Sequence, residues 1–215
     1  MDLPPLSLDQ LSAVLAAAPT PADLYTSLSD YEEQACLLST TPPNERELLV
    51  AFYTAFFFSH LLTDQICEAR ALTKRIPREL LQTDLLQNSL LLLRAVWQSK
   101  HHEIYKILRE LPWTERLQPI VQRYESYFQE KTLKEVSNSY ETIRPAAAAS
   151  YLGLDPAVAE GGDPAIIEKF TACGWKWDSQ KQLLHPKPIV TAPPKDDNLQ
   201  NELSQVMALI SNQGS

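Results

Sequence analysis

The chain has 215 residues, of which 44% are hydrophobic and 21% are charged, and its formal net charge is −8. This composition is ordinary for a globular protein, so wholesale disorder is excluded. No glycine precedes Gly153, and both a phosphate-binding P-loop and a dinucleotide-binding GxGxxG turn need glycine in the backbone. Nucleotide enzymes of these two types are therefore excluded.

The charge is distributed unevenly along the chain. Residues 1–45 contain seven acidic residues and no Lys or Arg, whereas the rest of the chain carries all 19 basic residues. The N-terminus lacks the basic region of a secretory signal and the Arg residues of a transit peptide. The longest unbroken apolar run, Leu48 to Tyr53, is six residues, far short of the roughly 18 that indicate a membrane span. We therefore expect no targeting segment and no contact with a membrane.

Capping residues and prolines predict two helices in the acidic N-terminal segment, residues 1–44. Ser7 with Gln10 resembles a capping box, and Pro19 ends the helix that it opens. Thr20 followed by Pro21 is typical of the start of a second helix, because proline at the first helical position loses no hydrogen bond.

Five further helices complete a predicted helical array over residues 1–131. Asn44 and Glu47 are expected to open the first, which is apolar on nearly every face and should therefore be central and buried. The next four are expected to begin at Asp64, Thr83, a residue shortly before Ile104, and Thr114. Helices joined by short connections pack as antiparallel neighbours, so we expect a right-handed, repeat-like array.

The pattern changes near residue 132 to the element order of a winged helix, predicted over residues 132–190. The expected elements, in chain order, are a short helix bearing Leu133, Val136 and Tyr140, a strand at 141–143, helices at 146–152 and 165–173, and strands at 175–177 and 183–185. Gly153 and Gly174 are expected to end the two later helices. The fold class is therefore mainly α: a helical array, a winged helix and a C-terminal tail helix.

A proline-rich tether, residues 191–197, precedes a predicted C-terminal helix, residues 198–211. Its apolar residues recur at spacings of 4, 3 and 4, in a seam narrow enough for packing against other helices: Leu199, Leu203, Val206 and Ile210. Two readings stay open, packing among helices of partner chains and folding back onto the array.

The sequence contains no convincing catalytic or metal-binding pattern. His101, His102 and Glu103 are adjacent, whereas two metal-binding His on one helix face are spaced i, i+4. We interpret them as a solvated helix start and expect no cofactor, no metal and no enzymatic activity. Cys36 and two further, widely spaced cysteines, Cys67 and Cys173, are interpreted as buried thiols rather than redox or metal-binding groups.

Lys74, Arg75 and Arg78 surround the end of the helix that Pro77 is expected to stop. The simpler interpretation is a favourable interaction with the negative end of the helix dipole. The alternative is contact with an acidic partner.

The winged helix offers two candidate interaction surfaces. Its third helix carries only Glu168 and Lys169 as charged residues, so counterion release would add little affinity for DNA, and no direct nucleic-acid binding is expected. In the wing, Trp175 and Trp177 fall on the same face of a strand. That strand, with Lys176 between the two tryptophans, could expose an edge that pairs with a neighbouring chain.

The order of these elements resembles the PCI domain family, found in the proteasome lid, the COP9 signalosome and translation initiation factor 3. Within it, short stretches resemble the subunit 8 branch of the COP9 signalosome. They are Ala69-Arg70 through Lys74-Arg75-Ile76-Pro77, Trp113-Thr114-Glu115, Gln118-Pro119-Ile120, Tyr151-Leu152-Gly153-Leu154, Gly174-Trp175 with Asp178-Ser179, Leu184, and Pro186-Lys187-Pro188.

The resemblance implies a non-catalytic scaffold in a complex whose metalloprotease subunit removes a ubiquitin-like modifier from cullins. It implies a place beside subunit 3 and neighbouring PCI subunits, a C-terminal helix in a shared helical bundle, and a location in the nucleus and cytoplasm. Two alternatives stay open: a PCI subunit of the proteasome lid or of initiation factor 3, and a free-standing winged-helix nucleic-acid binder.

Overall fold

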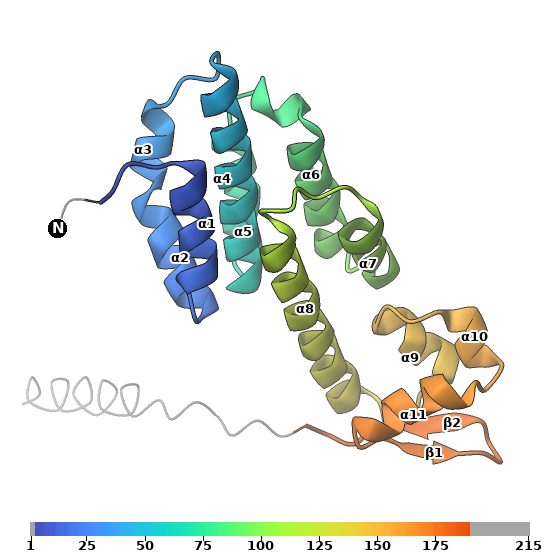
Figure 1. Ribbon diagram of the computed structural model, residues 1–215. Helices are drawn as coiled ribbons and strands as arrows, with labels where there is room; N and C mark the ends of the chain where they lie inside the picture. The colour runs from blue at the N-terminus through green and yellow to red at the C-terminus, as the bar shows by residue number, and fades with distance from the viewer. Residues whose placement is uncertain (1–2, 190–215) are drawn as a thin grey trace, which may run out of the picture.

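The computed structural model describes residues 3–189. It shows a set of antiparallel helices, a long connecting helix and a smaller lobe that ends in a β-hairpin (Figure 1). The proline-rich tether and the predicted C-terminal helix, with its seam of Leu199, Leu203, Val206 and Ile210, lie outside the described residues.

The acidic N-terminal segment forms three helices: α1 (Leu8–Ala17), α2 (Pro21–Asp30) and α3 (Glu32–Leu37). Both predicted caps are confirmed. The Ser7 hydroxyl accepts a hydrogen bond from the Gln10 backbone N–H, and that of Thr20 accepts one from Asp23. The short helix α3 was not predicted from the sequence.

Helix α4 (Pro43–Leu62) is the central helix of the array, as its apolar composition predicts. All of its residues from Leu48 to Leu62 are buried, and it contacts α1, α2, α5, α6 and α8. Its start differs from the prediction, since Pro43 is the first helical residue and Pro42 the N-cap. Proline needs no hydrogen bond at that position, so the helix begins before Asn44 can cap it.

Three α-helices and one short 3₁₀ helix continue the array: α5 (Ile66–Arg75), η1 (Leu80–Gln82), α6 (Asp84–Trp97) and α7 (His101–Glu110). Asp64 does not cap α5. Its backbone has φ +59°, and its carboxylate accepts a hydrogen bond from the Tyr127 hydroxyl at 2.6 Å. Thr83 is at the N-cap position of α6, but its hydroxyl donates to the Leu80 carbonyl at 2.7 Å instead of capping the helix.

Helix α8 (Gln118–Ser139) is continuous across the position where the sequence predicted two helices. It begins after a turn, so Thr114 does not cap it. The short helix expected from Leu133 is the second half of α8. No glycine or proline lies between Pro119 and Pro145, and without such a residue nothing in the backbone requires a break.

The smaller lobe has the winged-helix order with one additional helix. It contains α9 (Pro145–Tyr151), α10 (Pro156–Glu160), α11 (Pro164–Ala172), β1 (Lys176–Asp178) and β2 (Leu183–His185). The strand expected at 141–143 is reduced to one bridge between Ile143 and Leu184. Helix α10 was missed, although Asp155 caps it in the same way that Asp163 caps α11.

Two hydrophobic clusters organise these elements. The larger includes α4 and extends along α8 to Tyr124, whereas the smaller begins at Val136 of α8 and includes Phe170, Trp175 and Leu184. The mainly α fold is therefore confirmed. The handedness of the array and the division into domains at residue 131 stay predictions.

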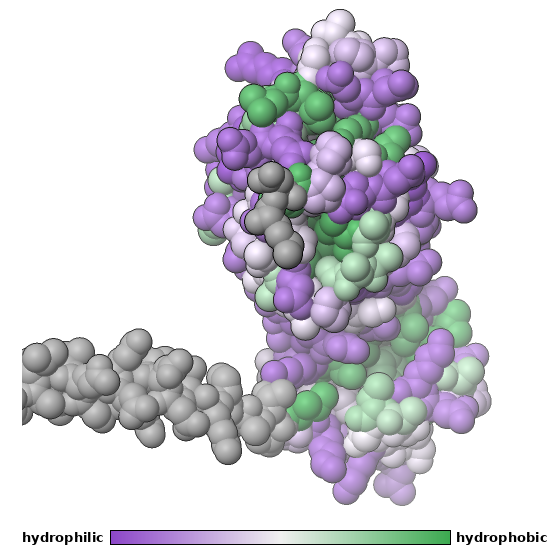
Figure 2. Space-filling model, turned by 60° about the vertical axis from the view of Figure 1, so that its left-hand side comes forward, coloured by the Kyte–Doolittle hydropathy of each residue, from purple (hydrophilic) through white to green (hydrophobic). Residues whose placement is uncertain are grey.

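The surface of the described part is mixed in character. On the face in Figure 2, hydrophobic residues form separate areas among hydrophilic ones. Between residues 3 and 189, none of the helices combines the length and the apolar character that a membrane crossing needs.

Candidate assembly interface

Trp175 anchors the wing inside the smaller lobe. Gly174, at φ +87°, turns the chain after α11 into a conformation that favours glycine. The Trp175 ring then stacks on Phe170 with a centroid distance of 5.4 Å, and its Nε1–H donates to the Ser137 hydroxyl at 3.0 Å. Only 2% of Trp175 is exposed, so its side chain is not available at the surface, and its predicted role in partner binding stays a prediction.

The face shared by Trp175 and Trp177 is the interior face of the hairpin. Trp177 is half-buried and packs against the smaller hydrophobic cluster. It also lines a groove of about 420 Å³ together with Pro145, Glu160 and Leu183. The prediction that the two tryptophans share a strand face is correct. Because this face of the hairpin covers the smaller hydrophobic cluster, the shared face is a buried one.

Among residues 3–189, no backbone group pairs with the outer edge of β1. Leu184 exchanges both backbone hydrogen bonds with Ile143, at 2.9 Å each. It lies opposite Trp177 in the antiparallel register, and pairs in such a ladder alternate between bonded and non-bonded. The Trp177 N–H and C=O therefore point away from β2, toward the open edge.

Lys176 is exposed, but its backbone faces inward. The same alternation makes Lys176 and His185 a hydrogen-bonded pair. The Lys176 N–H therefore pairs within the hairpin, and the outward-facing donor of this strand is the N–H of the next residue, Trp177. Register decides this point, because a shift of one residue reverses the direction of every backbone group.

The turn that joins the strands is held by Asp178. Its carboxylate accepts hydrogen bonds from the backbone N–H groups of Gln180 and Lys181, at 3.0 and 3.1 Å. The bond from Lys181 is the main cause that lowers the pKa of the Asp178 carboxyl. A fixed turn keeps the short strands in register and holds the open edge of β1 in one geometry.

His101 belongs to the contact between the array and the smaller lobe. Its ring lies 5.5 Å from that of Phe128 and 5.1 Å from that of Tyr151. His101 is only partly exposed, and burial lowers its pKa, so the predicted solvated helix start holds only in part for this residue. His102 and Glu103 are exposed, as predicted.

The three cysteines are exposed, against the prediction of buried thiols. Cys36 is on α3 and Cys67 is at the start of α5, where other residues form the buried face. Cys173 is the C-cap residue of α11. Among residues 3–189, no group of three or more His, Cys, Asp and Glu side chains is arranged to hold a metal ion.

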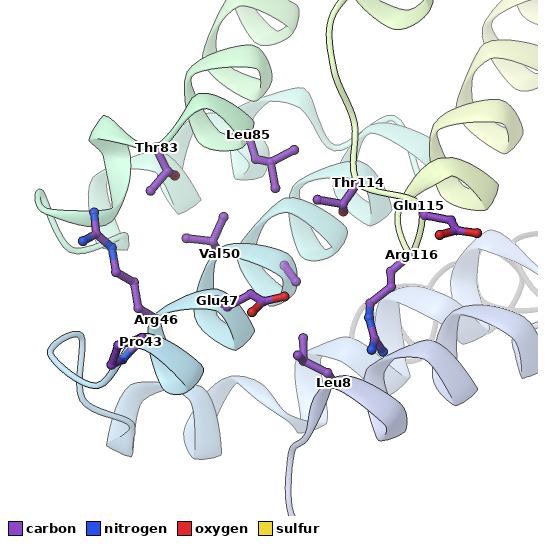
Figure 3. Close-up of a pocket in the computed structure, with 11 residues that line it drawn as sticks. Leu8, Pro43, Arg46, Glu47, Val50, Thr83, Leu85, Thr114, Glu115 and Arg116 are labelled. Carbon is purple, nitrogen blue, oxygen red and sulfur yellow. The ribbon is translucent and has the colours of Figure 1, made fainter.

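A groove of about 460 Å³ lies within the array, between α1, the first turns of α4 and α6, and the turn before α8. Arg46 and Arg116 lie at opposite ends of it, with Val50 and Leu85 between them (Figure 3). Arg116 also pairs with Asp9 at 3.4 Å. Sequence reasoning missed this groove because its walls come from segments far apart in the chain.

Comparisons with known proteins cover most of this structure. A model of the CSN8/PSMD8/EIF3K family matches residues 47–196. COP9 signalosome complex subunit 8 of Emericella nidulans is 81% identical over 215 residues, the full length of both chains. The corresponding subunits of Dictyostelium discoideum and Xenopus laevis are each 26% identical, over 66% of this chain and 69% of the relative.

The family match runs from the first turns of α4 to residues beyond β2, so it includes the central helix, α8 and the wing. The full-length similarity to the Emericella protein also includes α1 to α3. The resemblance predicted from short stretches is thereby confirmed, and the chain belongs to the CSN8/PSMD8/EIF3K family.

Proposed function

We propose that this chain is a non-catalytic scaffold subunit of the COP9 signalosome, the complex that removes a ubiquitin-like modifier from cullins. The observation that carries the proposal is the 81% identity over the whole chain to COP9 signalosome complex subunit 8. The proposal includes contacts with subunit 3 and neighbouring PCI subunits, and a location in the nucleus and cytoplasm.

The geometry of the wing supports a role in assembly. The open edge of β1 presents the Trp177 N–H and C=O, and a strand from another chain could pair with them in the manner of β-augmentation. Trp175 and the Asp178 turn hold this edge rigidly. A preorganised edge loses little conformational freedom when it binds.

The first test is the change Trp177→Pro, which removes the outward N–H, with Trp177→Val as the matched control that keeps it. Proline is tolerated where the strand N–H faces outward. One net hydrogen bond is worth about 0.5–1.5 kcal/mol, so the proline variant should bind its PCI partner about 2- to 10-fold more weakly than the valine variant. Affinity is measured with purified partner subunits, after circular dichroism shows that both variants are folded.

Equal affinity of the two folded variants would contradict pairing at this edge. Lys176→Pro serves as a second comparison, because its N–H pairs within the hairpin. It should lower the melting temperature, whereas Trp177→Pro should lower it no more than Trp177→Val does.

The second test concerns the C-terminal seam predicted from the sequence. Two buried aliphatic side chains contribute roughly 3–6 kcal/mol, which corresponds to about 10²- to 10⁴-fold in affinity. We expect Leu203→Asp with Val206→Asp to abolish incorporation into the complex and to leave the melting temperature of the isolated chain unchanged. A much lower melting temperature would mean that the seam packs on its own chain.

A further inference from the structure

Helices α5 and α6 together present an exposed surface of the array. We call it the α5–α6 surface and define it by Arg70 and Lys74 of α5 and by Arg94 and Trp97 of α6. All four residues are exposed. The two helices contact each other, and the Arg70 guanidinium lies over the Trp97 ring, 5.3 Å from its centroid.

Helical spacing places the other two cations beside this pair. Arg70 and Lys74 are four residues apart on α5, and Arg94 and Trp97 are three apart on α6, so each pair shares a helix face. The α5–α6 surface is therefore a continuous strip in which an aromatic ring lies among cations.

Trp97 is the most exposed tryptophan of the chain. It is 54% exposed, whereas Trp113 and Trp175 are 7% and 2% exposed, and Trp177 is half-buried. Large aromatic side chains contribute strongly when they are buried, and exposed Trp beside Arg is the composition typical of binding hot spots. Arg70 also orders the ring before any partner arrives.

The cations of the α5–α6 surface have no carboxylate partner in the described residues. None of Arg70, Lys74 and Arg94 lies within ion-pair distance of an acidic group between residues 3 and 189. The neighbouring Arg75, on a different face of α5, is by contrast paired with Glu32 at 2.9 Å. In a chain of net charge −8, such a group of unpaired cations is a local excess of positive charge.

A groove of about 500 Å³ continues the α5–α6 surface at the start of α5. Ile66, Cys67, Val96 and Trp97 are among its lining residues, and so are the acidic residues Asp64 and Glu68. Asp64 is already engaged by Tyr127 and Lys131. The groove thus offers an apolar recess next to the cations, with Glu68 as the one acidic group in it not engaged by another described side chain.

We propose that the α5–α6 surface docks an acidic segment of another protein chain, which places an aromatic or aliphatic side chain in the groove beside Trp97 and carboxylates on Arg70, Lys74 and Arg94. The cations of the α5–α6 surface favour a segment of negative charge, and the groove favours a segment with an apolar side chain at the matching position. The proposal rests on the proposed scaffold function in so far as the segment belongs to a chain of the same assembly.

A protein segment fits this surface better than a nucleic acid does. Three cations would neutralise few phosphates, so the counterion release that supplies most nucleic-acid affinity would be small. Arg70 covers one face of the Trp97 ring, which leaves less of the ring for stacking on bases.

Cys67 permits a direct test, because it is exposed and lines the groove. In a chain with Cys36→Ser and Cys173→Ser, Cys67 is labelled with a short photoactivatable cross-linker, and the labelled chain is assembled into the complex. We expect a cross-link to one segment of another subunit, identified by mass spectrometry, that is rich in Asp or Glu and contains an aromatic or aliphatic residue. No cross-link to another chain, a cross-link to a basic segment, or a cross-link to nucleic acid would each overturn the proposal.

Variants then test the chemistry of the contact. Trp97→Ala, and separately Arg70→Gln with Arg94→Gln, should reduce the cross-link yield at least tenfold. Lys106→Gln is the matched control, because Lys106 is an exposed cation on α7; it should leave the yield unchanged. Equal yields in all variants would contradict docking at the α5–α6 surface.

Incorporation into the complex separates this proposal from the proposed function. If the unsubstituted chain does not enter the complex, the scaffold function fails. If it enters and the cross-link is absent or insensitive to Trp97 and the two arginines, only the docking proposal fails. Melting temperatures of the isolated variants verify that each is folded.

Discussion

Single residues in this chain show how burial, rather than residue type, decides a role. Trp97 and Trp175 have the same side chain, yet the first is 54% exposed and the second 2%. Trp175 has a stacking partner in Phe170 and an acceptor in Ser137, so both its apolar and its polar parts are satisfied in the core. Trp97 has a cation over one face and lines a groove, and about half of the side chain stays exposed.

His60 is a buried histidine for which the structure predicts a pH dependence. It is 2% exposed, its Nδ1 lies 3.2 Å from the Gln65 Oε1, and its Nε2 has no partner among the described residues. Burial lowers its pKa below the usual value of 6.5. The unfolded chain therefore binds the proton more strongly, so the free energy of unfolding should decrease as the pH falls below about 6.5.

The measurement is urea unfolding at pH 8 and at pH 5. The loss of stability between the two should be smaller in His60→Leu than in the unsubstituted chain. His102→Gln, a change at an exposed residue, should leave the loss unchanged. A loss of the same size in His60→Leu would show that another group, such as His101, is responsible.

Helix ends are the features that local sequence predicts best. Ser7, Thr20 and Asp163 cap the helices that follow them because the cap needs only a side-chain oxygen two or three residues away. Asp64 and Thr114 failed as predicted caps, since tertiary contacts and an intervening turn decide their conformation. Local signals therefore locate helices well when no distant partner competes for the same group.

Gly153 follows the end of α9 and lies against Tyr105 of α7, so substitutions at this residue test what fixes the end of α9. Its φ is +68°, and a Cβ there would lie 2.5 Å from the Tyr105 ring. Gly162 has a similar φ of +71° but no atom within 4 Å of such a Cβ. Gly162→Ala should therefore cost about 1 kcal/mol for the backbone alone, and Gly153→Ala a further 1–3 kcal/mol for overpacking.

Thermal and urea unfolding measure the loss of stability in both glycine variants. Equal destabilisation would mean that Tyr105 moves aside without cost, which is inconsistent with a ring that is 2% exposed.

At the scale of the whole molecule, α8 and the Arg109 contacts connect the array to the smaller lobe. The Arg109 guanidinium lies 5.0 Å from the Tyr105 ring centroid, and its Nε donates to Glu125 at 2.7 Å. It also donates to the Gly153 carbonyl at 2.5 Å. One side chain thus contacts α7, α8 and the end of α9.

Arg109→Met should destabilise the smaller lobe while the array stays folded. Methionine keeps an apolar side chain but removes the two hydrogen bonds and the cation–π contact of Arg109. Hydrogen exchange with mass spectrometry should show faster exchange in α9 to α11 and unchanged exchange in α4. Lys106→Met on the same helix is the control. Faster exchange throughout the chain would instead mean that the contact stabilises the fold as a whole.

The sequence by itself determined most helix positions in the array, the caps at Ser7 and Thr20, the hairpin and the family, because these depend on neighbours within a few residues or on short stretches in order. Only the tertiary structure decided the continuity of α8, the burial of Trp175, the exposure of the cysteines and which backbone groups face the open edge of β1. These features depend on packing and on strand register between segments far apart in the chain. Spacing assigns a residue to a face, and what covers that face is a property of the folded molecule.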